Sequence, residues 1–201
     1  TSRIRRRSVA LSSIAQDLHT IHEQVSHLES SAMTDNPIDP AQFRQVLGHF
    51  PTGVTVITAC TSEGTGVGLT IGSFTSVSLD PPLVGFLPMV NSDRWPDIRD
   101  AGAFCVNILS ATQGELCWRF ARKSVMNPFD GVDWQRSAAT GSPVLAGAIA
   151  WIDCSIADVV EAGDHYFVIG RVLQLDHVAA ESKPNPLLFF RGKLGEFIEH
   201  E

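Results

Sequence analysis

The sequence predicts a mainly β protein, an antiparallel barrel with a few short helices. About seven β-rich runs recur along 201 residues. Turns and isolated helical segments join these runs, whereas a parallel sheet would need a crossover helix after each strand. With 44% hydrophobic and 18% charged residues, the chain is long enough to bury a sizeable core. We expect a barrel domain over residues 33–201, preceded by an N-terminal extension, residues 1–32.

The N-terminal extension has the pattern of an amphipathic helix. Its apolar residues are spaced by three and four, as in a coiled-coil seam. They are Leu11, Ile14, Leu18, Ile21, Val25 and Leu28. This pattern favours pairing with a second copy or a partner helix, and the alternative is a helix lying on the surface of its own domain. Residues 31–38 are expected to be a linker.

The first half of the barrel is predicted to start with a helix. Asp39, Pro40 and Gln42 form a helix N-terminus with capping-box spacing, and the helix reaches to about residue 50. Its apolar stripe, expected to be buried, is Phe43, Val46, Leu47 and Phe50. Strands are then expected at residues 54–59, from residue 67 after a turn, and at residues 83–87.

The second half alternates helices and strands before two long strands. We expect helices over residues 93–101 and 110–120, the second with a capping box from Ser110 to Gln113. Residues 121–143 are expected to be mostly loop because proline and glycine interrupt them. Strands are expected at residues 103–109, 148–160, 166–175 and 187–190.

The stretch from Gly68 to Pro82 is the most informative part of the sequence. It is dense in hydroxyl side chains, which are Thr70, Ser73, Thr75, Ser76 and Ser78. Short hydroxyls and glycine backbone on a strand suit a ligand rich in oxygen acceptors, such as a phosphate or a ring carbonyl. The alternative is an edge strand rich in serine and threonine that binds nothing.

Composition and motifs exclude several classes of protein. A formal net charge of −7 argues against a general nucleic-acid binder. No apolar run approaches the roughly 20 residues that span a bilayer. Glycine-rich dinucleotide, P-loop and nucleophile-elbow motifs are absent from the sequence. Cys60, Cys105, Cys117 and Cys154 form no C-x-x-C pair, which indicates buried, reduced thiols and a cytoplasmic protein.

Two short motifs are candidates for ligand binding. Asp164 and His165 lie in a turn between strong strands, where a histidine can donate to a charged ligand or merely bind the turn backbone. Ser92 and Arg94 precede a predicted helix, where they suit a phosphate, although Ser92 or Asp93 may only cap the helix.

Six runs resemble the short-chain flavin reductases, the reductase components of two-component monooxygenases. They are FRQVLGHFPTGVTVIT (43–58), GLTIGSFTSVSLDPPLVGF (68–86), FCVNILSATQ (104–113), GSPVLAGAIAWIDC (141–154), GDHYFVIGRV (163–172) and PLLFFRGK (186–193). The resemblance covers residues 39–195. It implies an FMN-binding split β-barrel, usually a homodimer with the flavin near the subunit interface. Residues 1–32 have no counterpart in it.

The resemblance also implies binding roles where residues match its motifs, although it names no certain catalytic residue. The flavin contacts implied are Thr70, Ser73, Phe74, Thr75, Ser76, Ser92, Arg94 and Asn107. His165, with Asp164, matches a turn near the nicotinamide. Arg94 replaces a hydroxyl of the family's phosphate motif. A basic residue of the family is missing before Phe129, and Arg122 or Lys123 is the expected substitute.

The resemblance implies an NAD(P)H:flavin oxidoreductase that uses FMN or FAD with NADH or NADPH. Its reduced flavin would serve a separate oxygenase acting on an aromatic or phenolic substrate. Two alternatives on the same barrel remain open: a non-enzymatic flavin carrier or sensor, and an oxidase of the pyridoxamine-phosphate type. The turn at His165 favours the reductase.

Overall fold

The structure is a computed structural model that describes residues 38–178 and 184–199. The chain divides into two units, residues 1–44 and 45–201, and helix α2 (Pro40–Leu47) crosses the boundary between them. The predicted N-terminal helix and most of the linker lie outside the described residues. The domain boundary expected near residue 33 therefore stays a prediction.

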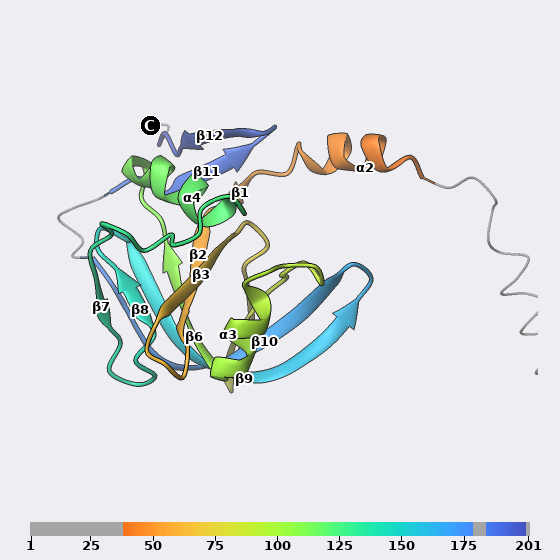
Figure 1. Cartoon of the computed structure of the whole chain (residues 1–201). Coiled ribbons are helices and arrows are strands. Elements are labelled where there is room, and N and C mark those ends of the chain that lie inside the picture. Colours follow the sequence, from red (N-terminus) through yellow and green to blue (C-terminus); the bar gives the residue numbers. More distant parts are fainter. Residues whose placement is uncertain (1–37, 179–183, 200–201) are drawn as a thin grey trace, which may run out of the picture. The chain divides into compact units, whose positions relative to one another are not determined.

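The second unit is built on one antiparallel sheet of seven strands, so the prediction of a mainly β, antiparallel fold is confirmed (Figure 1). The order across the sheet is β3-β2-β6-β9-β10-β5-β4. The strands are β2 (Thr55–Cys60), β3 (Gly66–Ile71), β4 (Thr75–Leu79), β5 (Pro82–Phe86), β6 (Ala103–Ile108), β9 (Ala150–Ala162) and β10 (His165–His177). Strands β9 and β10 are the longest, at 13 residues each, and pair through the turn at Gly163.

The connection from β3 to β4 shows that this sheet is strongly curled. These consecutive strands are the two edges of the sheet, yet only residues 72–74 join them. Three linking residues span about 14 Å at most. Seven strands laid flat would separate their edges by about 29 Å. The sheet must therefore curl until its edges approach, which gives a partly closed barrel.

Two smaller sheets accompany the main one. One joins β1 (Thr52–Gly53), β11 (Leu187–Phe190) and β12 (Lys193–Glu196), and the other pairs β7 (Trp134–Arg136) with β8 (Pro143–Leu145). The sequence predicted β11 but not the other four strands, and it left β7 inside a loop. These four strands have only two to four residues, too few to show an alternating pattern.

Three helical segments of the second unit confirm the predictions for this region. Helix α3 (Trp95–Ala101) buries Trp95 and Ile98, as expected. The 3₁₀ turn η1 (Ala111–Gln113) leads into α4 (Gly114–Ala121), and the predicted capping box is present between Ser110 and Gln113. Both α3 and α4 contact β3, so the segments flanking these helices are brought to that edge of the sheet.

Helix α2 (Pro40–Leu47) begins as predicted but does not bury its stripe. The Asp39 carboxylate accepts a hydrogen bond from the Ala41 amide at 3.1 Å, which supports the predicted start. The expectation of a buried stripe is wrong for the single chain, because all four of its side chains are exposed. They are Phe43, Val46, Leu47 and Phe50.

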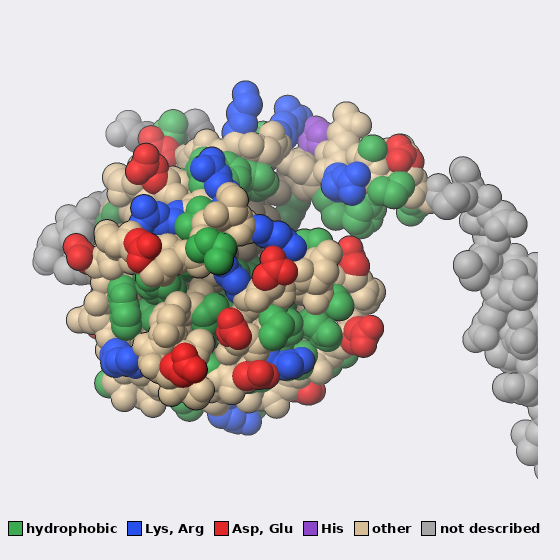
Figure 2. Space-filling view, viewed as in Figure 1, with side chains coloured by type: hydrophobic (Ala, Val, Ile, Leu, Met, Phe, Trp, Pro, Cys, Tyr) green, Lys and Arg blue, Asp and Glu red, His purple; other side chains and the backbone are tan. Residues whose placement is uncertain are grey.

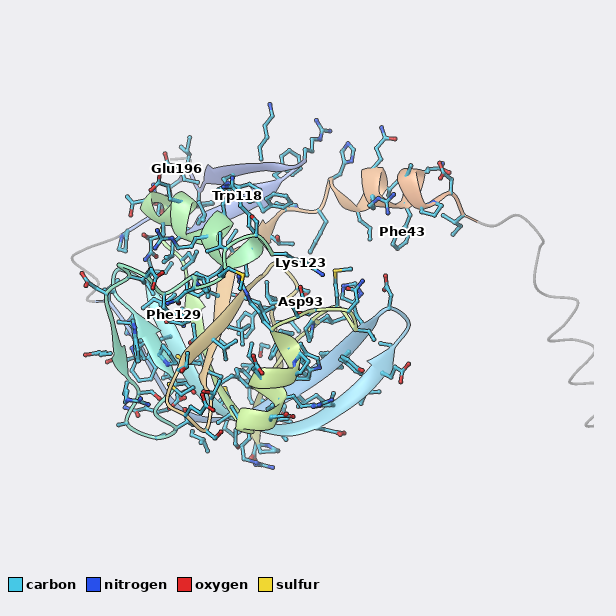
Figure 3. All side chains as sticks on the ribbon, viewed as in Figure 1. Phe43, Asp93, Trp118, Lys123, Phe129 and Glu196 are labelled. Carbon is cyan, nitrogen blue, oxygen red and sulfur yellow. The ribbon has the colours of Figure 1, made fainter. Side chains whose placement is uncertain are left out.

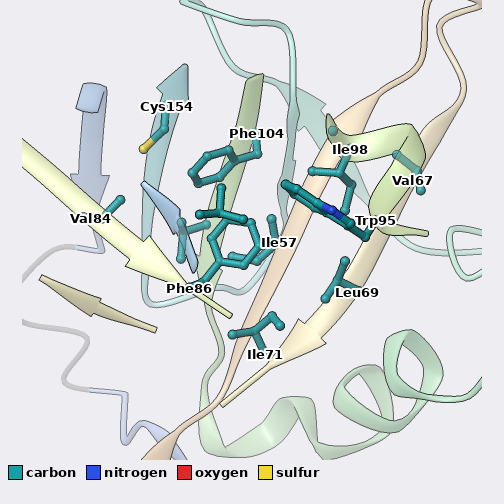
Figure 4. Packing of buried hydrophobic residues seen from close by; sticks show 13 residues of the cluster. Ile57, Val67, Leu69, Ile71, Val84, Phe86, Trp95, Ile98, Phe104 and Cys154 are labelled. Atoms are coloured by element: carbon teal, nitrogen blue, oxygen red, sulfur yellow. The ribbon is translucent and has the colours of Figure 1, made fainter. Parts of the chain in front are cut away.

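The core of the second unit consists of two clusters. In the larger one, Phe86 packs edge-on against Phe104 and Trp95, with ring centroids 5.0 and 6.0 Å apart (Figure 4). The smaller cluster joins Cys117 and Phe120 of α4 to the barrel. The two clusters anchor α3 and α4 separately, and these helices position the candidate site.

The cysteines are free thiols, as expected. Cys105, Cys117 and Cys154 are buried, whereas Cys60 is only half-buried. In the described ranges, no helix has the length and apolar character needed to cross a membrane.

Candidate functional site

A cavity of about 920 Å³ opens beside the β3 edge of the sheet. Its walls come from β3 with the two residues after it, from the segment leading into α3, from the segment that follows α4, and from His165. Of the ten residues predicted to bind flavin or nicotinamide, the cavity brings together Thr70, Ser73, Ser92, Arg94 and His165. The other five lie outside its lining.

Three of the predicted residues in the lining carry hydroxyls, and two of these hydroxyls donate to backbone carbonyls. Thr70 donates to the Cys117 carbonyl at 2.7 Å, which ties β3 to α4. Ser73 donates to the Leu87 carbonyl at 3.2 Å and accepts from the Leu87 amide at 3.1 Å. Ser92 only accepts, from the Trp95 amide at 3.3 Å. Ser92 therefore keeps its hydroxyl proton for a ligand, whereas Thr70 and Ser73 are left with acceptor capacity.

Phe74, Thr75 and Ser76 do not line the cavity, although the resemblance implied that they contact flavin. Strand β3 ends at Ile71, and the chain has crossed to the opposite edge of the sheet by Thr75. Phe74 packs against the larger core cluster, and Thr75 bonds to the neighbouring Ser76 carbonyl. One continuous stretch of sequence is therefore divided between two edges.

Arg94 holds the cavity wall through backbone carbonyls. Its Nη1 donates to the carbonyls of Gly68 at 3.1 Å and Phe120 at 2.6 Å, and its Nη2 donates to those of Arg122 at 3.2 Å and Val125 at 2.8 Å. The four Nη protons are thus in use. Burial lowers the pKa of this guanidinium, and the Asp93 carboxylate partly opposes that effect. This geometry favours a role in holding the wall over the expected contact to phosphate.

Asn107 is fully buried in the sheet, and the flavin contact expected for it does not fit this position. Its Nδ2 lies within 3.0–3.2 Å of the Val56 carbonyl, the Thr58 hydroxyl and the Pro143 carbonyl. Its Oδ1 accepts from the Leu145 amide at 2.8 Å. The side chain joins β6 to β2 and β8, and its hydrogen-bonding capacity is used.

Asp164 and His165 form a pair at one end of the cavity. His165 Nδ1 lies 2.7 Å from Asp164 Oδ1, and this hydrogen bond lowers the pKa of the carboxyl group. The carboxylate favours the tautomer with a proton on Nδ1, which leaves Nε2 as the second polar atom of the ring. His165 lines the cavity, while Asp164 is 86% exposed and lies outside the lining. Asp164 therefore orients His165.

Sequence reasoning named Lys123 only as a substitute and missed its partner. Lys123, from the segment after α4, lies on the cavity wall with its Nζ 3.5 Å from the Asp93 carboxylate (Figure 3). Asp97 lines the same wall. Arg122, the other predicted substitute, does not line the cavity. Because the two pairing residues are 30 positions apart in sequence, no local motif reveals them.

Close packing at Gly68 shapes the part of the cavity lining where β3 meets α4. A Cβ at this position would lie 2.9 Å from the Phe120 ring and 3.0 Å from the Ile57 carbonyl oxygen. Only glycine lets the ring of Phe120 approach this near to the strand.

Comparison with known proteins assigns the family. The family described as "Flavin reductase like domain" matches residues 47–197. A flavin reductase of Pseudomonas putida is 51% identical over 160 residues, which cover 80% of this chain and 91% of the relative. The reductase subunit HsaB of a flavin-dependent monooxygenase from Rhodococcus jostii (strain RHA1) is 44% identical and covers 81% of this chain and 80% of its own.

Solved structures show the same likeness. A homologue of nitrilotriacetate monooxygenase component B from Mycobacterium thermoresistibile has a TM-score of 0.76 at 45% identity, and covers 80% of this chain and 88% of that one. The NADH:FAD oxidoreductase SgcE6 of Streptomyces globisporus, solved with NAD and FAD fragments, has a TM-score of 0.74 at 36% identity, and covers 83% and 98%. Because the match spans three quarters of the chain and most of each relative, this protein belongs to the flavin reductase like domain family.

Proposed function

We propose that this protein supplies reduced flavin to a separate monooxygenase component that acts on an aromatic or phenolic substrate. The chain is an NAD(P)H-dependent flavin reductase, as its family membership and its likeness to NADH-dependent relatives indicate. The aromatic class of substrate rests on the sequence resemblance alone. The structural relative from Mycobacterium thermoresistibile carries a nitrilotriacetate name, so reductases of this family serve partners of more than one chemistry.

The observation that carries the flavin-binding part of the proposal is the cavity beside β3. Its volume of about 920 Å³ lies within the range of small-molecule and cofactor sites and can take two stacked rings. The Ser92 hydroxyl and the Lys123 ammonium provide donors for a phosphate at one part of the wall. These residues fit a flavin mononucleotide moiety.

When bound, flavin and nicotinamide would supply the redox chemistry, a hydride transfer from nicotinamide C4 to flavin N5. The protein's part is to position the two rings. We propose that Ser92 and Lys123 bind the phosphate, that Thr70 and Ser73 accept from the flavin ring, and that His165 contacts the nicotinamide. No proton transfer by a side chain is required for the hydride step.

A steady-state assay tests this function. NADH and NADPH are each supplied with FMN, FAD or riboflavin, and nucleotide oxidation is followed at 340 nm. A reductase oxidises the nucleotide in proportion to added flavin, whereas a carrier binds flavin without oxidising it. A pyridoxamine-phosphate oxidase would instead turn over its own substrate without a nicotinamide. Flavin binding without nucleotide oxidation would refute the reductase assignment.

His165→Ala tests the assignment of the nicotinamide side. The variant should raise the KM for the nicotinamide nucleotide several-fold more than the KM for flavin. Asp164→Asn is the matched variant, because it removes the orienting carboxylate and keeps the ring. It should give a smaller change in the same direction. Equal effects on both KM values would return His165 to a role in the turn alone.

We further propose that the protein is a homodimer in the cytoplasm. Exposed apolar side chains, among them Phe43 and Val46 on α2 and Phe189 and Phe190 on β11, support an interface with a second copy, since large apolar surface is rarely left in water. The N-terminal stripe, whose residues lie outside the described ranges, is expected to strengthen the dimer. A chain that begins at Met33 should dissociate more readily in sedimentation at falling concentration, with unchanged turnover per folded dimer. Equal dissociation would rule out that role.

A further inference from the structure

Lys123 is a basic group of the cavity wall that a ligand can reach, and this group is already paired. Lys123 Nζ donates to the Asn91 carbonyl at 3.3 Å and lies 3.5 Å from the Asp93 carboxylate. The Lys123 and Asp93 side chains are 66% and 71% exposed, so both can move. Figure 3 shows the two labelled side chains close together, one from the segment after α4 and one from the segment before α3.

The other cation of the wall cannot replace Lys123 without breaking the fold locally. Each Nη proton of Arg94 has a backbone carbonyl as its acceptor. These carbonyls belong to β3, to the end of α4 and to the segment that carries Lys123. Arg94 thus fixes the place from which Lys123 extends, and Lys123 is left as the mobile positive charge.

The charges of the cavity lining cancel. Asp93 and Asp97 balance Arg94 and Lys123 when His165 is neutral. On the face shown in Figure 2, basic and acidic side chains are interspersed and form no single positive field. An incoming phosphate therefore meets no net attraction, and its affinity depends on whether it can take the Lys123 ammonium from a carboxylate.

We propose that Asp93 competes with the phosphate of flavin for Lys123, and thereby keeps flavin binding weak enough for release. The inference rests on the proposed placement of the flavin phosphate at Ser92 and Lys123. Asp93 needs no contact with the flavin, because it acts through the side chain that both anions share. Such competition suits a reductase whose product must leave for a second protein.

The competition has a specific signature in the choice of ligand. Removing the carboxylate releases the ammonium and removes one repulsion against phosphate. An exposed ion pair corresponds to a change of up to about five-fold in affinity at low salt. Riboflavin has no phosphate, so the affinity for riboflavin should stay nearly unchanged. The gain for FMN should also fall as ionic strength rises, since exposed charges are screened.

The test measures dissociation constants of FMN and riboflavin by flavin fluorescence for the full chain and four variants. Asp93→Asn removes the competing charge. Asp97→Asn makes the same charge change on the same wall, beyond ion-pair distance of Lys123 within the described residues. Lys123→Gln removes the shared cation, and the double variant of Asp93 and Lys123 completes a cycle. Thermal unfolding confirms that each variant is folded.

The proposal expects Asp93→Asn to tighten FMN binding about two- to five-fold and to change riboflavin binding less than about 1.5-fold. Asp97→Asn should change FMN binding less than about 1.5-fold, and most of the gain at Asp93 should vanish when Lys123 is glutamine. Equal gains in FMN affinity from Asp93→Asn and Asp97→Asn would overturn the competition, and so would a gain that persists when Lys123 is glutamine. Either result would mean that removing any negative charge from the cavity wall strengthens FMN binding. An unchanged or weaker affinity for FMN in Asp93→Asn would also overturn the competition.

The proposed function and this inference fail separately. If the variants show the expected pattern but nucleotide oxidation is absent, the reductase assignment falls and the competition stands. If oxidation is normal but Asp93→Asn leaves FMN affinity unchanged, the competition falls alone. A full chain that binds neither flavin overturns both.

Discussion

Arg94 should stabilise the fold through the cavity wall. Its guanidinium donates to four carbonyls on three segments of the chain, and two of the bonds are short, at 2.6 and 2.8 Å. A hydrogen bond contributes about 0.5–1.5 kcal/mol net, and the lower half of that range applies because the side chain is only partly buried. Arg94→Ala should therefore lower the free energy of unfolding by about 2–4 kcal/mol.

The conservative variant separates geometry from charge. Arg94→Lys keeps one positive charge, but a single ammonium cannot serve two pairs of carbonyls that lie in different directions. It should recover no more than about half of the loss. Arg99→Ala is the matched control, because Arg99 is an exposed arginine on α3 whose ion pair joins it to the adjacent Asp100. That change should cost less than about 0.5 kcal/mol.

Urea unfolding followed by tryptophan fluorescence measures these differences. Hydrogen exchange adds a local test, because the amides of residues 122–125 should lose protection in Arg94→Ala before the strands do. A loss below about 0.5 kcal/mol in Arg94→Ala, or full recovery in Arg94→Lys, would refute the argument that the carbonyl contacts hold this wall. Either result would also restore Arg94 as a candidate for the phosphate contact.

Three further predictions concern the interior. Asn107→Leu should destabilise the fold by about 3 kcal/mol or more, because it leaves several buried polar groups without their hydrogen-bond partner. The FMN affinity of the folded fraction should be unchanged in a titration. Gly170→Ala should cost about 1–3 kcal/mol in urea unfolding, because its Cβ would lie 2.4 Å from the Phe104 ring. Burial, and secondarily a neighbouring carboxylate, raises the pKa of Cys154 from 9.0 to about 12. The folded state holds that proton more tightly, so stability should be full below pH 9 and fall towards pH 12, less steeply in Cys154→Ala.

The sequence predicted local structure where local rules decide. Strand periodicity placed the long pair β9 and β10, and helix-start chemistry placed the capping box at Ser110 and Gln113. Apolar spacing also identified the buried face of α3. These features depend on residues within one turn or one strand of each other, so a linear pattern contains the information. Motif order over residues 43–193 was enough to indicate the family.

The site itself depends on which distant segments meet, and only the tertiary structure decided that. Thr70 and Ser76 belong to one polar stretch, yet the order of the strands places them on opposite edges of the sheet. Arg94 stands where a phosphate motif has a hydroxyl, but the carbonyls that it binds belong to residues 26 to 31 positions away. The exposed stripe of α2 shows the same limit, because amphipathic spacing reveals a buried face without revealing what buries it. The sequence by itself therefore determined the elements and the family. The closure of the sheet decided which polar groups face the cavity, because hydrogen-bond partners remote in sequence are fixed only when the strands pair.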